Sequence, residues 1–162
     1  MLNLTKIKHS DTIYQSMLSD LIKEIFTEFY IDIFPKEHLD YILDFSDEKT
    51  IQDEIKIDKK EYYFIEINNK IIGFLGCYQE NKKINICDLY LKKQYRQKGY
   101  GSKVINKLKE NTLIEELRIK INKNLKDVLS FFIKHNFKKD KQIATYIGNG
   151  YFNYETIYTC KI

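Results

Sequence analysis

One segment restricts the fold of this chain more than any other, because it joins a strand to a helix through a glycine turn. Residues 84–91 read INICDLYL, an apolar strand, and residues 96–101 read RQKGYG after a short basic loop. A helical pattern starts at once with Val104, Ile105 and Leu108. Glycine lets the backbone turn sharply, and the first amides of a helix are unpaired and lie at the positive end of its dipole. The segment therefore predicts a site for phosphate or pyrophosphate.

Other phosphate-binding loops fit this glycine turn less well. A dinucleotide fingerprint requires G-x-G-x-x-G, and Val104 stands at the position of the third glycine. The chain also has no G-x-x-x-x-G-K-[ST] string, which a P-loop requires. A glycine turn that only ends or begins a helix would look similar. Arg96, Lys98 and Lys103 favour an anion site, because they add positive charge around the turn.

The composition favours one folded domain in a reducing compartment. The chain has 162 residues, of which 43% are hydrophobic, and this suits a single domain over residues 1–162. The N-terminal residues resemble neither a signal peptide nor a membrane anchor, and no apolar run approaches the roughly 18 residues of a spanning helix. The three cysteines fit reduced thiols in a cytoplasmic protein, and no Cys or His spacing predicts a metal site. Frequent Lys, Asn, Ile and Tyr suggest an AT-rich bacterial genome.

Charge is distributed unevenly along the chain. Residues 1–90 contain 11 Lys, no Arg and 17 Asp and Glu, a formal charge of −6, and residues 91–162 contain 16 Lys and Arg against 6 Asp and Glu, a formal charge of +10. The basic part suits a polyanionic ligand and the acidic part a cationic one, although both can equally be solvated faces. The basic part has neither a helix-turn-helix pattern nor an RNA-recognition motif, so nucleic acid is not an expected partner.

Hydrophobic periodicity predicts a mixed α/β domain with the element order β-α-α-β-β-β-α-β-α-β-β. The first helix should face the core with a stripe that recurs every four residues, at Ile13, Met17, Leu21, Ile25 and Phe29, after a cap at Asp11. The expected strands are residues 2–8, 62–67, 71–79, 84–91, 117–121, 137–147 and 151–160. The expected helices are residues 11–30, 35–45, 100–112 and 125–135, with a short helical stretch from Ser46.

Three stretches together resemble the GNAT superfamily of acetyl-CoA-dependent N-acetyltransferases, of the bacterial type. RQKGYG at residues 96–101 resembles the signature R/Q-x-x-G-x-G/A, and residues 122–137 resemble N-x-x-A-x-x-F-Y-x-K-x-G-F. The ending IGNGYFNYETIYTCKI is similar to the final hairpin of many bacterial members. The resemblance implies the GNAT fold, a mixed α/β sheet, over nearly the whole chain.

The resemblance implies an acyltransferase that moves an acetyl group from acetyl-CoA to a primary amine, with no metal. Strand backbone would pair with the pantetheine arm, and the amides of the glycine turn would meet the pyrophosphate. Asn122 or Asn124 would add a contact to CoA, unless these residues only cap a helix. The implied CoA-binding residues are Leu89, Tyr90, Leu91, Arg96, Gln97, Lys98, Gly99, Tyr100, Gly101, Ser102, Asn122 and Asn124.

The residues for proton transfer depart from the family pattern. Many members have a Glu on the fourth strand as general base, but the corresponding positions here are Asn85 and Cys87. The adjacent Asp88 is the candidate base, although it should point to the opposite face because side chains alternate along a strand, and a bulge can turn it inward. The usual acid is a Tyr, and Phe132 stands at its position. Tyr151, Tyr146 or Tyr30 can replace it, or CoA can leave as a thiolate.

The acceptor should approach the first helices, where carboxylates alternate with aromatic side chains. Glu28 and Asp32 flank the expected helix break, with Tyr30 between them, and together they suit a cationic amine. The other interpretation is that these carboxylates are solvated helix faces. A homodimer is common among such proteins. A non-enzymatic acyl-CoA sensor on the same fold remains the alternative function, because the usual base and Tyr are missing.

Overall fold

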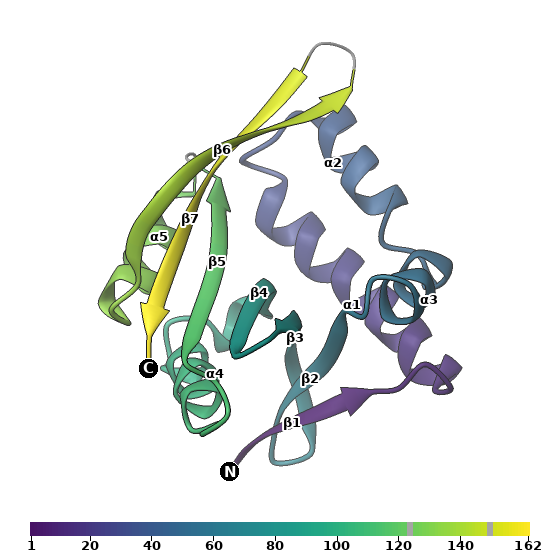
Figure 1. The fold of residues 1–162 in the computed structure, drawn as a ribbon. Coiled ribbons are helices and arrows are strands. Elements are labelled where there is room, and N and C mark those ends of the chain that lie inside the picture. Colours follow the sequence, from purple (N-terminus) through teal and green to yellow (C-terminus); the bar gives the residue numbers. More distant parts are fainter. Residues whose placement is uncertain (123–124, 149–150) are drawn as a thin grey trace. The chain divides into compact units, whose positions relative to one another are not determined.

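The computed structural model describes residues 1–122, 125–148 and 151–162 (Figure 1). Among the predicted site residues, Asn124 lies outside these ranges, and nothing is described of the side chains of Tyr146 and Tyr151. The chain forms two compact units. Unit 1 comprises Met1–Cys77 and Asp88–Val104, and unit 2 comprises Tyr78–Cys87 and Ile105–Ile162.

The elements agree with the predicted mixed α/β class, with one helix more than the predicted order contains. In chain order they are β1 (Leu2–Ile7), α1 (Thr12–Tyr30), α2 (Lys36–Asp44), α3 (Glu48–Lys56), β2 (Glu61–Ile67), β3 (Lys70–Glu80), β4 (Lys83–Leu91), a 3₁₀ turn (Lys93–Tyr95), α4 (Tyr100–Lys109), β5 (Glu116–Asn122), α5 (Lys126–Lys134), β6 (Lys138–Gly148) and β7 (Tyr151–Lys161). The helical stretch from Ser46 is the additional helix, α3. It is capped by Asp47, whose carboxylate accepts a hydrogen bond of 2.7 Å from the Thr50 amide.

Seven strands are hydrogen-bonded in the order β1-β2-β3-β4-β5-β7-β6. The ladders of β1 with β2, β2 with β3, β5 with β7 and β6 with β7 are antiparallel, whereas β4 and β5 are parallel. This sheet confirms the expected fold class. None of the helices in the described part of the chain is both long and apolar enough to cross a membrane.

The core of unit 1 lies between helices α1 and α3 and strands β1 to β3 (Figure 1). From α1 it takes Leu18, Leu21, Ile22 and Ile25. The predicted stripe was wrong at its start, because Ile13 is 73% exposed and Met17 is 41% exposed. Residues four apart are 400° apart around a helix and drift off one face, whereas the spacing of 18, 21, 22 and 25 stays on it.

The turn before α1 is closed by a buried amide instead of the predicted cap. The side chain of Gln15 is fully buried, and its Nε2 donates to the carbonyl oxygens of Lys8 at 3.1 Å and His9 at 2.9 Å. Asp11 makes no side-chain cap on α1, and its carboxylate accepts from the Lys8 amide at 3.2 Å. The prediction of an Asp11 cap was therefore wrong, because that carboxylate bonds to the turn that precedes the helix.

In unit 2, helix α5 connects β5 to β6. Phe132 of α5 is buried and makes an edge contact with Phe137, with ring centroids 5.1 Å apart. Phe132 is thus a core residue. Its side chain has no proton to give to a leaving thiolate. Asn136 ends this segment with a φ of 67°, the left-handed conformation that asparagine tolerates better than most residues.

A buried carboxylate with three cationic neighbours marks the start of β5. The Oε1 of Glu116 lies 2.5 Å from Arg118 Nε and 3.5 Å from Lys83 Nζ, and its Oε2 lies 2.6 Å from Lys161 Nζ. Burial raises the pKa of Glu116, but hydrogen bonds from Lys161 and Arg118 outweigh this and lower it to about 2. The ionised carboxylate is therefore stabilised in the folded state.

Glu116→Gln should destabilise the protein by about 1 to 2 kcal/mol at pH 7, a value reduced for the exposure of Lys161. The contribution is complete above the unfolded pKa of Glu, about 4.3, and disappears as the pH falls through the folded value of about 2. Urea unfolding of both proteins at pH 7 and at pH 3 measures this difference. A destabilisation that is the same at both pH values would show that charge is not its cause.

Candidate active site

The predicted glycine turn is present in unit 1, between the end of β4 and the start of α4. The Lys92 amide donates to the Ile72 carbonyl at 2.9 Å, and this bond fixes the chain where it leaves the sheet. Gln97 and Gly99 have φ values of 58° and 79°, so the turn is built on two left-handed residues. A Cβ on Gly99 would have no heavy atom within 4 Å, so the space beside this residue is open.

The amides of this turn are available to a ligand. The first helical hydrogen bond of α4 runs from the Lys103 amide to the Gly99 carbonyl. Within the described residues, no hydrogen bond is made by the amides of Gln97 to Gly101. These amides belong to the three residues before α4 and to its first two residues, so they lie at the positive end of the dipole of this ten-residue helix. An anion that accepts hydrogen bonds from these amides would also lie at the positive end of the helix dipole, and these are the two features of a phosphate site at a helix start.

Arg96 fixes the turn against helix α1. Its Nε donates to the Leu91 carbonyl at 2.8 Å, its Nη2 donates to Glu28 Oε2 at 3.2 Å, and its guanidinium lies 5.2 Å from the centre of the Phe29 ring. Arg96, which was predicted to bind CoA, is thus paired with Glu28, which was predicted to bind the acceptor amine. The charge of Glu28 is already paired, which weakens the case for it as an independent site for a cationic amine.

Strand β4 is paired with β5 over only the first part of its length. Its ladder with β5 contains four pairs and ends where Ile86 faces Ile119, although β4 continues to Leu91. On its other edge β4 approaches β3 closely, because a Cβ on Gly73 would stand 2.1 Å from the Tyr90 carbonyl oxygen. The predicted pantetheine-binding residues, Leu89, Tyr90 and Leu91, therefore lie beyond the end of the β4–β5 ladder.

Asp88 lies in a cluster of charged side chains in unit 1. Lys60 Nζ lies 3.0 Å from Asp88 Oδ2 and 3.1 Å from Glu54 Oε1, and the hydroxyl of Tyr62 donates to Glu54 at 2.5 Å. Asp88 faces away from the exposed Cys87, in agreement with the alternation expected along β4. The face on which Asp88 lies carries helices α1 to α3, and its carboxylate reaches a cavity there.

Burial determines the protonation behaviour of this cluster. It raises the pKa of Asp88, and the nearby Lys60 only partly opposes this. Burial alone would lower the pKa of Lys60, but Asp88, Tyr62 and Glu54 together raise it above its usual value. Lys60 therefore stays cationic, and Asp88 is a stronger base than an exposed carboxylate. A carboxylate with a raised pKa is suited to accepting a proton from an amine.

The cavity next to Asp88 has a volume of about 310 Å³, and the described residues that line it all belong to unit 1. One end is polar and contains Glu54, Lys60, Tyr62 and Asp88. The remaining walls are mostly apolar side chains of the first three helices: Ile22, Phe26, Tyr41, Ile42, Phe45 and Ile51. A small molecule with one polar end and one apolar end matches this arrangement.

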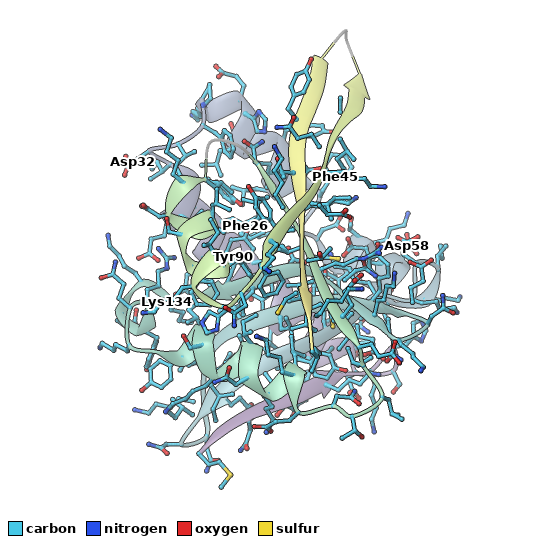
Figure 2. All side chains as sticks on the ribbon, turned by 60° about the vertical axis from the view of Figure 1, so that its left-hand side comes forward. Phe26, Asp32, Phe45, Asp58, Tyr90 and Lys134 are labelled. Carbon is cyan, nitrogen blue, oxygen red and sulfur yellow. The ribbon has the colours of Figure 1, made fainter. Side chains whose placement is uncertain are left out.

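Tyr30 and Tyr90 form a second polar pair in unit 1. Their hydroxyl oxygens are 2.5 Å apart, and Tyr90 stacks on Phe74 with ring centroids separated by 5.5 Å. Figure 2 shows Tyr90 next to Phe26, whose ring centroid is 4.9 Å away, and shows Asp32 pointing outward. Burial raises the pKa of both hydroxyls, so both are protonated at neutral pH. The structure brings Tyr30 into contact with Tyr90 of β4, whereas Asp32 is exposed.

The remaining predicted contacts lie in unit 2 and are less completely described. Asn122 ends β5, and its carbonyl accepts from the Leu125 amide at 3.0 Å, as in a turn that leads into α5. Tyr151 begins β7. In the described part of the chain, no group of His, Cys, Asp and Glu has the arrangement of a metal site.

Comparison with known proteins identifies the family. The acetyltransferase (GNAT) family matches residues 19–137, which is most of the sequence, so the chain belongs to this family. It is therefore classed as a GNAT-type acetyltransferase, as the sequence motifs indicated. None of the curated proteins matches the sequence significantly.

Solved structures share the fold at low sequence identity. PaiA N-acetyltransferase from Thermoplasma acidophilum, in complex with coenzyme A, has a TM-score of 0.75 and 19% identity, over 100% of this chain and 99% of that chain. A GNAT acetyltransferase from Elizabethkingia anophelis with acetyl-CoA bound has a TM-score of 0.62 and 15% identity, over 99% and 98%. The spermidine/spermine N-acetyltransferase SpeG from Vibrio cholerae has a TM-score of 0.64 and 12% identity, over 99% and 95%. The likeness in these cases is one of fold.

Proposed function

We propose that this protein transfers the acetyl group of acetyl-CoA to a primary amine of a small molecule or a protein. The observation that carries the proposal is the glycine turn, where the amides of Gln97 to Gly101 make no hydrogen bond within the part of the chain that the structure describes. They would hold the pyrophosphate, with Lys98 and Lys103 nearby as counter-charges. The backbone of Leu89 to Leu91 would pair with the pantetheine arm, as an added strand does.

The reaction proposed needs one base and one proton donor. The ammonium group of the acceptor gives a proton to the Asp88 carboxylate, directly or through water, and the nitrogen lone pair then attacks the thioester carbonyl carbon. The C–N bond forms and the C–S bond breaks. CoA leaves as a thiolate and takes a proton from Tyr30, from Tyr151 or from water, and the acylated nitrogen gives up its second proton to restore that donor, which leaves a neutral amide. A backbone amide of β4 near Leu91 would stabilise the negative charge that develops on the carbonyl oxygen.

The alternative function, an acyl-CoA sensor, is favoured by a different observation. Asp88 is already paired with Lys60, and the family position of the acidic Tyr is occupied by the buried Phe132. A sensor would bind acetyl-CoA through the same glycine turn and would release no CoA in the presence of amines.

Gly99→Val should weaken the binding of acetyl-CoA at the glycine turn without unfolding the protein. Its φ of 79° is strained for valine, and its side chain would fill the open space beside the unpaired amides. We expect CoA release from acetyl-CoA with a panel of primary amines in the wild type, and at least a tenfold higher KM for acetyl-CoA in the variant. Ellman detection of the CoA thiol measures both.

Asn69→Val is the matched control for Gly99→Val. Asn69 lies in the turn between β2 and β3 with a φ of 60°, so valine introduces similar strain away from the site. This control should lose stability and keep its KM for acetyl-CoA. An equal rise in KM for both variants would mean that strain, and not the glycine turn, limits binding. If the wild type binds acetyl-CoA and acetylates no amine, the sensor function is favoured.

A further inference from the structure

The polar end of the cavity in unit 1 carries one net negative charge. Asp88 and Glu54 are two carboxylates, and Lys60 lies between them at 3.0 and 3.1 Å. Tyr62 adds a neutral hydroxyl that is already bonded to Glu54. A single cation placed beside Asp88 would bring this end of the cavity to neutrality. A buried charge is costly unless it is paired, so the cluster favours one ammonium group over none.

Among the described residues, the rest of the cavity lining carries no charged partner for a second cation. Ile22, Phe26, Ile42 and Ile51 supply only hydrocarbon, and Ser46 donates its hydroxyl to the Ile42 carbonyl at 3.1 Å. A polyamine drawn into this space would have to leave a second ammonium group against apolar walls. That arrangement would lose hydration without compensation. The volume of about 310 Å³ is at the lower end of small-molecule sites, which suits a compact ligand.

Two aromatic rings of α2 and its C-cap lie along this cavity with much of their surface in water. Tyr41 is 59% exposed and Phe45 is 58% exposed, and their ring centroids are 4.9 Å apart. Both line the cavity, together with the more deeply placed Phe26. Aromatic surface at the edge of a cavity gains most from a flat apolar ligand, through ring contacts and loss of hydrating water.

We propose that this cavity is the acceptor site and that its acceptor is an arylalkyl primary amine, which carries one ammonium group on an aromatic body. The inference deepens the proposed function and rests on it for the reaction. The ammonium group would lie at Asp88, and the aromatic body would lie along Phe26, Tyr41 and Phe45. Asp88 lies three residues before Leu91 on β4, and the thioester carbonyl is proposed to lie near Leu91, so the amine and the thioester would lie along the same strand.

This assignment differs from the one that the sequence favours, a cationic amine at Glu28 and Asp32. Glu28 is engaged with Arg96, and Asp32 is exposed. SpeG of Vibrio cholerae, which has the same fold, is a spermidine/spermine enzyme. The acceptor proposed for this chain has one charge where those polyamines have several, and the difference can be measured directly.

Two measurements with 2-phenylethylamine, ethylamine and spermidine test the assignment. In steady-state assays, kcat/KM for 2-phenylethylamine should exceed the value for ethylamine and for spermidine by about tenfold or more, as expected for one well-placed ring contact. Phe45→Ala should reduce the ratio of 2-phenylethylamine to ethylamine about tenfold. Ile57→Ala, which removes an apolar side chain of similar exposure (68%, against 58% for Phe45) outside the cavity, should leave the ratio unchanged.

Calorimetric titration with 2-phenylethylamine measures binding at the proposed acceptor site, even if no amine is acetylated. Wild-type protein and Ile57→Ala should bind it, and Phe45→Ala should bind it about tenfold more weakly. Binding without turnover of any amine would contradict the proposed function and leave the cavity assignment supported. A preference for spermidine, or equal ratios and equal affinities in wild type and Phe45→Ala, would overturn the assignment.

Discussion

Gly73→Ala is expected to destabilise the protein by about 3 kcal/mol or more, a large share of the roughly 5 to 15 kcal/mol that holds a typical domain folded. Gly73 is buried in β3, and a Cβ there would stand 2.1 Å from the Tyr90 carbonyl oxygen and 3.0 Å from Leu91 Cα. Both atoms belong to the backbone of β4, so the collision can be relieved only by moving that strand. Alanine is otherwise more favourable than glycine inside a strand, so a loss of stability on Gly73→Ala would identify the collision as its cause.

Gly76→Ala provides the comparison for this stability prediction. A Cβ on Gly76 would stand 2.4 Å from Asp88 Oδ2 and 3.0 Å from Tyr62 Cε1, which are side-chain atoms. We expect a smaller loss of stability, because side chains can move where a strand cannot, and a loss of activity as the Asp88 carboxylate is displaced. Urea unfolding of both variants measures the difference. If Gly73→Ala were as stable as the wild type, the close approach of β3 and β4 would be contradicted.

Asp88→Asn is expected to lower kcat by about 100-fold or more while the KM for acetyl-CoA changes little, because removal of a general base typically costs this much. Asparagine keeps the shape of the side chain and cannot accept the proton of the acceptor. The wild-type rate should rise with pH as Asp88 loses its proton. This rise should lie at higher pH than for an ordinary carboxylate, since burial raises the pKa of Asp88.

The pH profile distinguishes a base from a residue that only supports the structure. Asp88→Asn should lose the rise in rate that belongs to Asp88, and a variant that is merely less stable would keep it. Asp58→Asn is the matched control, because Asp58 is an exposed carboxylate just before β2, outside the cavity. A less than threefold fall in kcat for Asp88→Asn would assign proton removal to water or to another group.

Local patterns were sufficient to predict the elements around the site. The boundaries of β4 and the start of α4 agree with the sequence within one residue, because each depends on neighbours along the chain. The left-handed Asn136 could likewise be predicted from its position after a helix. Helix α1 shows where such reasoning fails. Its four-residue repeat predicted buried side chains at Ile13 and Met17, which are exposed, because a repeat along the chain does not specify which face of the helix meets the sheet.

The charged contacts of the site could not be predicted in this way. Arg96 and Glu28 are 68 residues apart in the sequence, and each looks like a separate ligand-binding residue. Nothing in the sequence was a reason to place Lys60 and Glu54 in the site. They lie in a stretch of mixed charges between a helix and a strand, and such a stretch looks like a solvated loop. Only the fold places them beside Asp88. A lone carboxylate at the centre of an apolar strand was the one available signal that polar partners had to exist nearby.

Transfer of an isotope-labelled acetyl group tests the central claim most directly. The protein is incubated with acetyl-CoA that carries deuterium in the acetyl group, together with 2-phenylethylamine, and the products are separated by mass spectrometry. An acetyltransferase should give the deuterated amide and free CoA in equal amounts, and Asp88→Asn should give both much more slowly. Recovery of intact acetyl-CoA with unmodified 2-phenylethylamine, spermidine and peptide amines, from protein that binds acetyl-CoA, would contradict the account.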